Sequence, residues 1–440
     1  MLDKKITLIG AGLAGPLMAN YLAKKGFFVE IYERRSDMRK IELSAGRSIN
    51  LALSARGIMA LKEIGIFDNI KPFIIPMSGR MIHDKSGETN FQSYGQRNSE
   101  VIYSISRSKL NMELMNFAEE TGSISIYFNH KLLKANIDKR ELIFEKKVVS
   151  FNRVFGCDGS GSVLRNAIVN KTKTKFVQKP LGHGYKELSM PASKHNEYQI
   201  DYNALHIWPR GNFMMIALPN IDKTFTVTIF MPLKGEISFD TIKTEKQIED
   251  FFTINFMDAL KLMPNLLEDF KKNPIGSLAS NYCDQWHYKD KAVIFGDAAH
   301  AVVPFFGQGM NASFQDCIVL NKLINKYGKN WGKIFNSFSS QHVKNGHAIA
   351  NMALENYVEM RDSVNDSSYL ERRELELDLE KKFPNKFIPR YSMVSFHQIP
   401  YEQVYKRGEV QFKLMSDFLS KKITLRDLYK NIENFLEPIS

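Results

Sequence analysis

The stretch "KITLIGAGLAGPLMANYLAKKG", residues 5–26, decides the fold, because it joins a β-branched run to a glycine-rich turn and then to a helical pattern. The turn has the form GxGxxG, with Gly10, Gly12 and Gly15 in the three glycine positions. A second strand-like run, "FVEIYE", ends on Glu33, 23 residues after Gly10. Strand, glycine turn, helix, strand and acid in this order predict a dinucleotide-binding fold.

Each residue of this pattern has a physical reason. Gly10 permits the tight turn, Gly12 lets a pyrophosphate approach the backbone, and Gly15 lets the helix pack closely on the strand. The helix N-terminus then offers unpaired N–H groups and the positive end of its dipole to the phosphates. Glu33 is expected to accept hydrogen bonds from an adenosine ribose. The motif by itself does not distinguish FAD from NAD.

Two later stretches favour a flavin. "VFGCDGSGSVLR" (154–165) places Asp158 between a strand-like run and a helix start, and "KAVIFGDAAHAVVPFFGQGMN" (291–311) places Asp297 just past another strand. An aspartate there can hold the hydroxyls of a ribityl chain, and the helix start after it can supply N–H groups to the electron-rich edge of an isoalloxazine. The alternative role of Asp297 is a simple helix cap. Its pairing with the distant GxGxxG turn favours the flavin.

Composition and charge narrow the class of protein. With 440 residues, 44% of them hydrophobic, the chain can bury two structural regions. The net charge of +12 is spread among acidic residues without an aromatic-interleaved basic stripe, so we expect small anionic partners and no nucleic acid. Cys157, Cys283 and Cys317 form no metal-binding or disulfide pattern. We find no run of 18 uncharged apolar residues and no leader, so we expect a cytoplasmic protein without a transmembrane segment.

Longer strings carry a family resemblance. With the motifs above, the chain resembles the single-component, class A flavin monooxygenases and, more closely, the kynurenine 3-monooxygenase family. The similarity runs in order from Lys4 to about Phe396. Strings of this length are far more specific than a motif of three glycines. Its strings are "GRSINLALSARG" (46–57), "MIHDKSG" (81–87), "SISRSKLN" (104–111), "FNHKLL" (128–133), "HIWPRGNFMMIALPN" (206–220), "FFGQGMN" (305–311) and "ALENYVEMRD" (353–362).

This resemblance implies an α/β fold with three regions. A Rossmann-like FAD-binding domain of the p-hydroxybenzoate hydroxylase type is expected at 1–70, 99–170 and 285–345. A substrate domain with a mixed or antiparallel β-sheet is expected at 71–98 and 171–284. A helical C-terminal region is expected at 346–440. Eukaryotic members carry a C-terminal membrane anchor, whereas this tail is amphipathic and charged, so we expect a soluble, bacterial-type form with the last helix packed on the body rather than on a membrane surface.

The resemblance also implies FAD contacts along the chain. Val163 departs from the hydroxyl residue expected at its position, so its contact would come through backbone or packing. The residues expected to bind FAD are Gly10, Gly12, Ala14, Gly15, Tyr32, Glu33, Arg34, Arg35, Ala52, Arg107, Leu132, Asp158, Val163, Asp297, Met310 and Asn311.

An amino-acid substrate is expected to meet a second set of residues. Arg80 would form a bidentate ion pair with the carboxylate, and neutral donors would come from Tyr94, Asn356 and Tyr391. The spacing of Arg80 and Tyr94 is that of a short hairpin. Pro304, Phe305 and Phe306 would face the substrate ring. For His300 a structural role is favoured over that of a catalytic base, and no catalytic acid, base or metal is assigned.

The implied activity is 3-hydroxylation of L-kynurenine in the tryptophan/kynurenine pathway, on the route to quinolinate and NAD, and whether it serves tryptophan degradation or NAD synthesis is left open. NADPH would reduce FAD, and O2 would then form a flavin C4a-hydroperoxide that hydroxylates the ring. Only one GxGxxG occurs, so the nicotinamide has no Rossmann domain of its own. Two alternatives stay open: a related hydroxylase of another aromatic acid, and a flavoprotein without turnover. The oligomeric state is left open.

Overall fold

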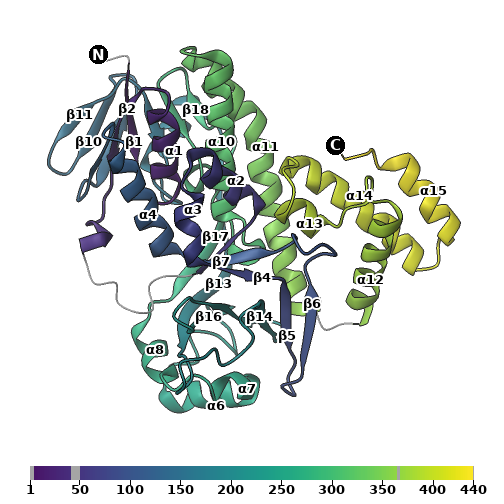
Figure 1. Cartoon of the computed structure of the whole chain (residues 1–440). Coiled ribbons are helices and arrows are strands. Elements are labelled where there is room, and N and C mark those ends of the chain that lie inside the picture. Colours follow the sequence, from purple (N-terminus) through teal and green to yellow (C-terminus); the bar gives the residue numbers. More distant parts are fainter. Residues whose placement is uncertain (1–3, 41–49, 364–366, 440) are drawn as a thin grey trace. The chain divides into compact units, whose positions relative to one another are not determined.

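The computed structural model describes residues 4–40, 50–363 and 367–439, so residues 46–49 of the string "GRSINLALSARG" lie outside the described residues. The chain divides into two compact units (Figure 1). Unit 1 comprises Met1–Ile74, Ser104–Leu181 and Ser277–Ala353, and unit 2 comprises Ile75–Tyr103, Gly182–Gly276 and Leu354–Ser440. The contacts therefore group the C-terminal helices with the β-rich segments, and the three-region division stays a prediction.

The main sheet of unit 1 has the strand order β18-β19-β12-β1-β2-β8. All neighbours are parallel except the edge strand β18, so the predicted Rossmann-like sheet is confirmed. Parallel strands bring their carboxyl ends to one edge, which places the glycine turn beside the ends of β2 and β12. The strands are β1 (Lys5–Ile9), β2 (Phe28–Tyr32), β8 (Ile124–Tyr127), β12 (Val154–Gly156), β18 (His287–Tyr288) and β19 (Ala292–Ile294).

Helices enclose this sheet, and α1, α2 and α10 pack on one another. Their apolar faces are buried, as at Leu17 and Met18 of α1 and Phe314 and Ile318 of α10. The helices are α1 (Ala14–Ala23), α2 (Ala55–Ile64), α3 (Phe67–Ile70), α4 (Arg107–Glu120), α5 (Val163–Thr172), α9 (Asp297–His300), α10 (Gly309–Tyr327) and α11 (Trp331–Val358), with 3-10 turns η2 (Met38–Lys40), η3 (Lys71–Phe73) and η4 (Pro304–Phe306).

Two small sheets accompany the main one. An antiparallel meander has the order β11-β10-β9, formed by β9 (Leu132–Asn136), β10 (Glu141–Phe144) and β11 (Val148–Ser150). A second sheet has the order β3-β7-β4, formed by β3 (Asn50–Leu53), β4 (Ile74–Met77) and β7 (Ile102–Ser106).

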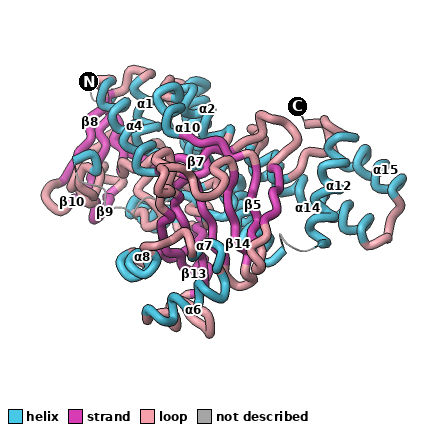
Figure 2. The backbone as a smooth tube through the Cα atoms, turned by 60° about the horizontal axis from the view of Figure 1, so that its bottom comes forward, coloured by secondary structure: helices cyan, strands magenta, loops and turns pink. Residues whose placement is uncertain are grey.

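Unit 2 contains a mixed sheet, as predicted, in the order β13-β16-β15-β14-β5-β6, with β17 (Gly276–Cys283) as the other neighbour of β13. Among β5, β6, β13, β14, β15 and β16, only the β14–β5 pair is parallel, and Figure 2 shows these two strands side by side. Trp208, Met215 and Val227 pack with Phe252 and Phe256 in one buried cluster, which joins the sheet to its helices. These elements are β5 (Gly79–His83), β6 (Thr89–Ser93), β13 (Phe176–Met190), β14 (Ala204–Pro209), β15 (Met214–Pro219), β16 (Phe225–Pro232), α6 (Glu245–Asn255), α7 (Met257–Leu260) and α8 (Leu266–Lys272).

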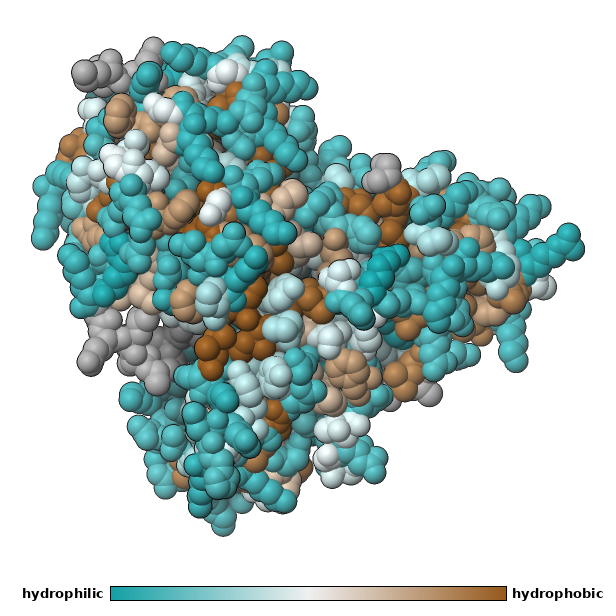
Figure 3. Space-filling view, in the orientation of Figure 1, coloured by the Kyte–Doolittle hydropathy of each residue, from teal (hydrophilic) through white to brown (hydrophobic). Residues whose placement is uncertain are grey.

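The C-terminal segment is helical, as predicted. It consists of a π-helical turn (Glu359–Ser363), α12 (Ser367–Lys382), α13 (Arg390–Ser395), α14 (Tyr401–Leu419) and α15 (Leu425–Phe435). Leu428 and Ile432 of α15 are buried in a cluster with Leu414 and Met415 of α14, so the last helix packs on its neighbour. The outer side chains of these helices are mostly hydrophilic on the face seen in Figure 3. Among the described helices, none has the length and apolar character to cross a membrane.

Candidate active site

In the glycine turn of unit 1, the fold requires glycine at positions 10 and 15, whereas Gly12 faces open space. Gly10 has φ +106°, and a Cβ there would lie 2.4 Å from the carbonyl oxygen of Cys157. A Cβ on Gly15 would lie 2.1 Å from the carbonyl oxygen of Gly10, whereas one on Gly12 would meet nothing within 4 Å. Backbone packing thus demands Gly10 and Gly15, and the clearance at Gly12 is what a phosphate needs. Ala14 begins α1 directly after this opening.

Glu33 follows β2 and is fixed against the glycine turn. Its carboxylate, 5% exposed, accepts hydrogen bonds from the N–H of Ala11 at 2.8 Å and from the N–H and Nε of Arg35 at 3.0 and 2.8 Å. Burial raises the pKa of Glu33, but the hydrogen bonds and charge of Arg35 and the N–H of Ala11 outweigh it, so the pKa lies below its ordinary value. The carboxylate is therefore ionised and oriented, as a ribose acceptor must be.

Two predicted FAD residues have buried side chains nearby. The ring of Tyr32 stacks on Tyr127 with centroids 5.0 Å apart and packs on Phe144 at 4.8 Å, and Leu132 is buried at the start of β9. The carbonyl of Tyr32 accepts a hydrogen bond from the N–H of Gly10. Tyr32 therefore supports the turn through its backbone. Arg34 and Arg107 are exposed.

Asn111 of α4 was missed by the sequence reasoning, although it ends the string "SISRSKLN". Its Nδ2 donates to the carbonyl of Ala11 at 3.2 Å, so it ties α4 to the glycine turn. Its Oδ1 is buried and has no hydrogen-bond partner among the described residues. A buried acceptor left open beside the turn fits a bound dinucleotide.

The Asp158-Gly159 motif caps α5. One carboxylate oxygen of Asp158 accepts from the hydroxyl of Ser162, and the other accepts from the N–H groups of Val163 and Leu164 at 2.8 and 3.3 Å. The N–H of Val163 is therefore used within the protein. The FAD contacts predicted for Asp158 and Val163 stay predictions, and the structure shows that both residues hold the turn in place.

The Gly296-Asp297 turn leaves Asp297 exposed in front of a buried ionic cluster. The N–H of Gly296 donates to Oδ2 of Asp316 at 2.8 Å, and Nε2 of His300 donates to the same oxygen at 2.6 Å. The other oxygen of Asp316 faces Nδ1 of His342 at 3.4 Å. A Cβ on Gly296 would lie 3.7 Å from Cβ of Ala14, so this turn and the glycine turn are neighbours.

The buried cluster gives His300 a structural role. Burial lowers the pKa of His300, but the charge and hydrogen bond of Asp316 outweigh it and raise the pKa. Burial raises the pKa of Asp316, but His300 and His342 hold it well below its ordinary range. Asp316 was missed by the sequence reasoning. The available signal was an acid inside the apolar helical pattern "SFQDCIVL".

Asn311 joins distant segments of the cofactor region. Its Nδ2 donates to the carbonyls of Ala52 and Gly307, both at 2.8 Å, and its Oδ1 accepts from the N–H of Ser54 at 3.0 Å. The side chain is thus fully used, so any contact of Asn311 with FAD would come from its backbone N–H at the start of α10. Met310 is buried one residue earlier.

The residues predicted to face the substrate ring form the turn η4. Phe305 and Phe306 are buried within unit 1, whereas Pro304 is exposed. Their contact with a substrate stays a prediction.

In unit 2, three of the four predicted substrate residues come together as an aromatic and cationic cage. Arg80 lies on β5, which pairs antiparallel with β6, so the expected hairpin before Tyr94 is confirmed. The rings of Tyr94 and Tyr391 stack with centroids 4.9 Å apart. The guanidinium carbon of Arg80 lies 4.8 Å from the centroid of Tyr391 and 5.8 Å from that of Tyr94. Sequence segments almost 300 residues apart therefore meet around one cation.

The cation of this cage is buried, and its tyrosine hydroxyls lie beside it. Arg80 is 7% exposed, and among the described residues its nearest carboxylate is Glu359, at 4.0 Å. Burial lowers the pKa of Arg80, but Tyr369, Tyr391, Tyr94 and Glu359 outweigh it, and the guanidinium stays charged. Tyr94 is 2% exposed, and its hydroxyl has no well-aligned hydrogen-bond partner among the described residues. A buried cation and an open hydroxyl suit a carboxylate ligand.

Asn356, the fourth predicted substrate residue, is 4% exposed near the end of α11, and its Nδ2 contacts Sδ of Met360. Sequence reasoning missed Glu359 and Tyr369. Glu359 lies in the quoted string "ALENYVEMRD", and the available signal was an acid three residues after Asn356, which is one turn of helix.

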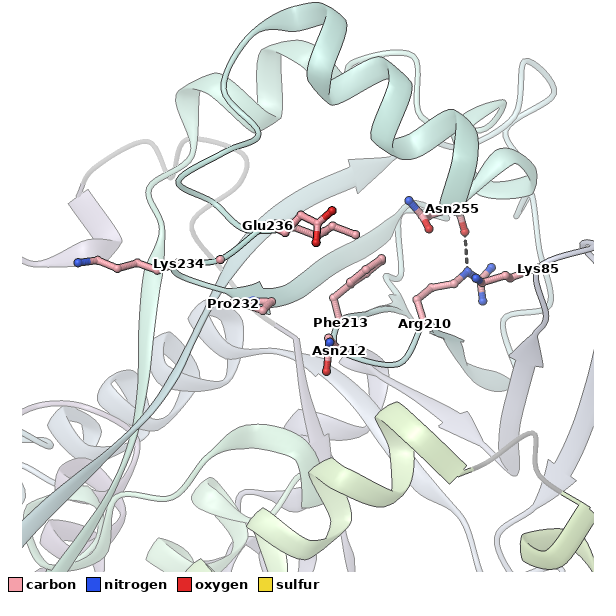
Figure 4. Close-up of a pocket in the computed structure, with 10 residues that line it drawn as sticks. Lys85, Arg210, Asn212, Phe213, Pro232, Lys234, Glu236 and Asn255 are labelled. Carbon is pink, nitrogen blue, oxygen red and sulfur yellow. Dashed lines mark hydrogen bonds between the residues drawn. The ribbon is translucent and has the colours of Figure 1, made fainter.

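A separate cavity of about 420 Å³ in unit 2 contains none of the predicted residues (Figure 4). Arg210 lines it, but its guanidinium donates to the carbonyls of Asn255, His83 and Asp84 at 2.6, 2.9 and 2.9 Å. The guanidinium of Arg210 therefore holds these loops together. None of the other lining residues carries a buried charge.

Comparison with known proteins defines the class of the fold. The FAD binding domain family matches residues 3–341. CtdE, solved in complex with FAD and a substrate, superimposes with a TM-score of 0.70 at 15% identity, covering 94% of this chain and 99% of that chain. The tetrameric form of 2-methyl-3-hydroxypyridine-5-carboxylic acid oxygenase gives a TM-score of 0.68 at 17% identity, covering 82% and 93%. The fold is that of the class A flavin monooxygenases.

Curated relatives narrow this class. A kynurenine 3-monooxygenase of Myxococcus xanthus is 43% identical over 418 residues, covering 94% of this chain and 90% of the relative. One of Anopheles gambiae is 43% identical over 422 residues, covering 94% and 86%. The chain belongs to the kynurenine 3-monooxygenase family, which confirms the resemblance seen in the sequence.

Proposed function

We propose that this chain is an FAD-dependent monooxygenase that consumes NADPH and O2 and converts L-kynurenine to 3-hydroxy-L-kynurenine. The observation that carries this proposal is near-full-length similarity, at about 40% identity, to kynurenine 3-monooxygenases of bacteria, an insect and an amoeba. The cage around Arg80 supports it independently, because the substrate is an α-amino acid with one carboxylate.

The residues of unit 1 fit FAD. The open space at Gly12 and the start of α1 would receive the pyrophosphate, and the ionised Glu33 would accept the ribose hydroxyls. The exposed Asp297 and the first N–H groups of α10 would hold the ribityl chain and the pyrimidine edge. When bound, FAD takes electrons from NADPH and uses them to activate O2. The part of this chain is to hold, orient and shield that chemistry.

The residues of unit 2 would orient the substrate by its amino-acid end. Arg80 would pair with the carboxylate, and the hydroxyls of Tyr94 and Tyr391 would donate to it, with Asn356 as a further neutral donor. Little acid/base chemistry by side chains is needed for the attack itself, because the ring carbon beside the aromatic amine is already electron-rich. We further propose that the positive net charge attracts small anionic molecules, not nucleic acid. The cytoplasmic location stays a prediction.

The test is to purify the protein, record its flavin absorbance, and follow NADPH oxidation with and without L-kynurenine. We expect yellow protein, oxidation stimulated by L-kynurenine, and 3-hydroxykynurenine as product by mass spectrometry. Stimulation by L-kynurenine with hydrogen peroxide as the only product would contradict the proposal. A stronger response to another aromatic acid would favour a related hydroxylase, and flavin without any NADPH oxidation would favour a non-catalytic flavoprotein.

A further inference from the structure

The carboxylate of Glu359 stands between two arginines and, among the described residues, has no ion-pair partner closer than 3.6 Å. Its Oε1 lies 4.0 Å from Nη1 of Arg80, and its Oε2 lies 3.6 Å from Nη2 of Arg372. The side chain is 27% exposed. Both separations exceed the roughly 2.7–2.9 Å of a charge-assisted hydrogen bond, so neither arginine saturates the carboxylate.

The gap between Arg80 and Glu359 matches one α-amino acid. In such a ligand the ammonium nitrogen and the carboxylate carbon are only about 2.5 Å apart, because both are bonded to the same Cα. A carboxylate held by Arg80 would therefore bring its ammonium group next to Glu359. The guanidinium of Arg80 and the carboxylate of Glu359 are 4.0 Å apart. Each can therefore contact the ligand group of opposite charge without first breaking a short ion pair.

Charge balance points the same way. Arg80 and Arg372 carry two positive charges and Glu359 one negative charge, so the three groups sum to +1. A zwitterion leaves this sum unchanged and gives Arg80 and Glu359 each a partner. Burial, followed by the charge of Glu359, raises the pKa of Tyr369 to about 12, so this neighbouring hydroxyl is neutral and adds no charge.

Glu359 lies at an unusual point of the backbone. It is the first residue of the π-helical turn Glu359–Ser363, which follows directly after α11. Such turns are rare and occur often at functional sites. Asn356, on the turn before it, is one of the predicted substrate residues.

We propose that Glu359 binds the α-ammonium group of the substrate, and that Arg80 and Glu359 together select an α-amino acid over the corresponding acid that lacks the amine. This inference rests on the proposed function, because it assumes that the substrate carboxylate binds Arg80. The competing role is that Glu359 only positions Arg80.

The experiment compares two ligands in the FAD-loaded enzyme: L-kynurenine and 4-(2-aminophenyl)-4-oxobutanoate, which lacks the α-amine. Binding is measured by calorimetry and turnover by NADPH oxidation, for the unaltered protein, Glu359→Gln, Glu359→Asp and the control Glu374→Gln. Glu374 is an exposed acid on α12. Calorimetry keeps the test valid even where the analogue is not hydroxylated.

We expect Glu359→Gln to raise the Kd and KM for L-kynurenine about 10- to 100-fold, as for the loss of a hydrogen bond between charged groups, and to change those of the analogue less than about threefold. Glu359→Asp should recover part of the loss, and Glu374→Gln should change neither ligand. An equal loss for both ligands would show that Glu359 only positions Arg80, and no loss for either would overturn the proposal outright. If the unaltered protein binds neither ligand, the proposed function itself fails, which is a distinguishable outcome.

Discussion

The cofactor region of unit 1 and the cage of unit 2 use polar side chains in opposite ways. In unit 1, the side chains of Glu33, Asp158, Asn311 and Asp316 are hydrogen-bonded within the protein, each to at least one backbone N–H or C=O group. In unit 2, the buried cation Arg80 has no carboxylate closer than Glu359, at 4.0 Å, among the described residues, and Tyr94 and Glu359 keep polar atoms beside it.

This difference separates two kinds of recognition. A dinucleotide is bound largely by backbone N–H groups, so the side chains of unit 1 serve to hold the backbone in the right shape. A small amino acid is bound by side chains, so the charged and hydroxyl groups of unit 2 must stay available to it. Substitutions of residues that hold the backbone of unit 1 in shape should therefore affect stability together with FAD binding, whereas substitutions in the cage should affect substrate binding alone.

The largest expected effect comes from the glycine turn. Gly10→Ala places a Cβ 2.4 Å from a backbone oxygen at a positive φ, so we expect a marked loss of stability and almost no bound FAD. Gly12→Ala meets nothing within 4 Å, so the FAD-free protein should keep its Tm while FAD affinity falls at least about 10-fold. Thermal unfolding and flavin content measure both. Equal Tm losses in the two variants would contradict the distinct roles of these glycines.

The buried cluster behind Asp297 should show as pH-dependent stability. The raised pKa of His300 means that its pairing with Asp316 contributes stability that is full below the unfolded pKa of about 6.5 and is lost as pH rises through the higher folded value. Asp316→Asn leaves the two histidines without their anion, so we expect a loss of about 3 kcal/mol at pH 6 and a smaller loss at pH 9.

Urea unfolding of the FAD-free protein across this pH range measures the Asp316→Asn difference, with Asp222→Asn on an exposed turn as the control. A loss that does not change with pH would mean that His300 is neutral in the folded protein.

The cage should separate substrate binding from cofactor binding. Arg80→Ala removes the buried cation, so we expect the KM for L-kynurenine to rise about 100-fold while the bound FAD per chain is unchanged. Arg80→Lys should recover only part, because an ammonium group cannot make the bidentate pair. Steady-state kinetics and flavin absorbance are the measurements. A parallel fall in FAD content would mean that Arg80 serves the fold.

The smallest effect should come from one hydroxyl group. Tyr94→Phe removes an oxygen that has no well-aligned partner among the described residues, so stability should stay the same or rise slightly. The KM for L-kynurenine should rise about three- to tenfold. Unfolding and kinetics on the same preparation check both halves. A stability loss with an unchanged KM would place the hydroxyl in the structure of the protein instead of the binding site.

Much of the fold could be predicted from local sequence. The GxGxxG turn and Glu33 predict the central parallel strands, because β1, its turn and β2 are close along the chain and obey short-range rules. The Asp158 and Asp297 turns were found for the same reason, since each follows a strand directly. The predicted ligand roles of Arg80, Tyr94, Asn356 and Tyr391 came instead from resemblance to a family, because no local pattern marks a lone arginine or tyrosine as a ligand.

The sequence by itself determined the dinucleotide fold, because glycine conformation, strand ends and helix starts are properties of neighbouring residues. Only the tertiary structure decided which polar groups are bonded within the protein and which are available to a ligand. Asp316 became a support of the Gly296 turn only once α10 was packed behind it, and Glu359 came within 4.0 Å of Arg80 only once the π-helical turn lay near β5. The physical reason is that burial and charge pairing depend on contacts between different elements of the fold, which no local pattern records.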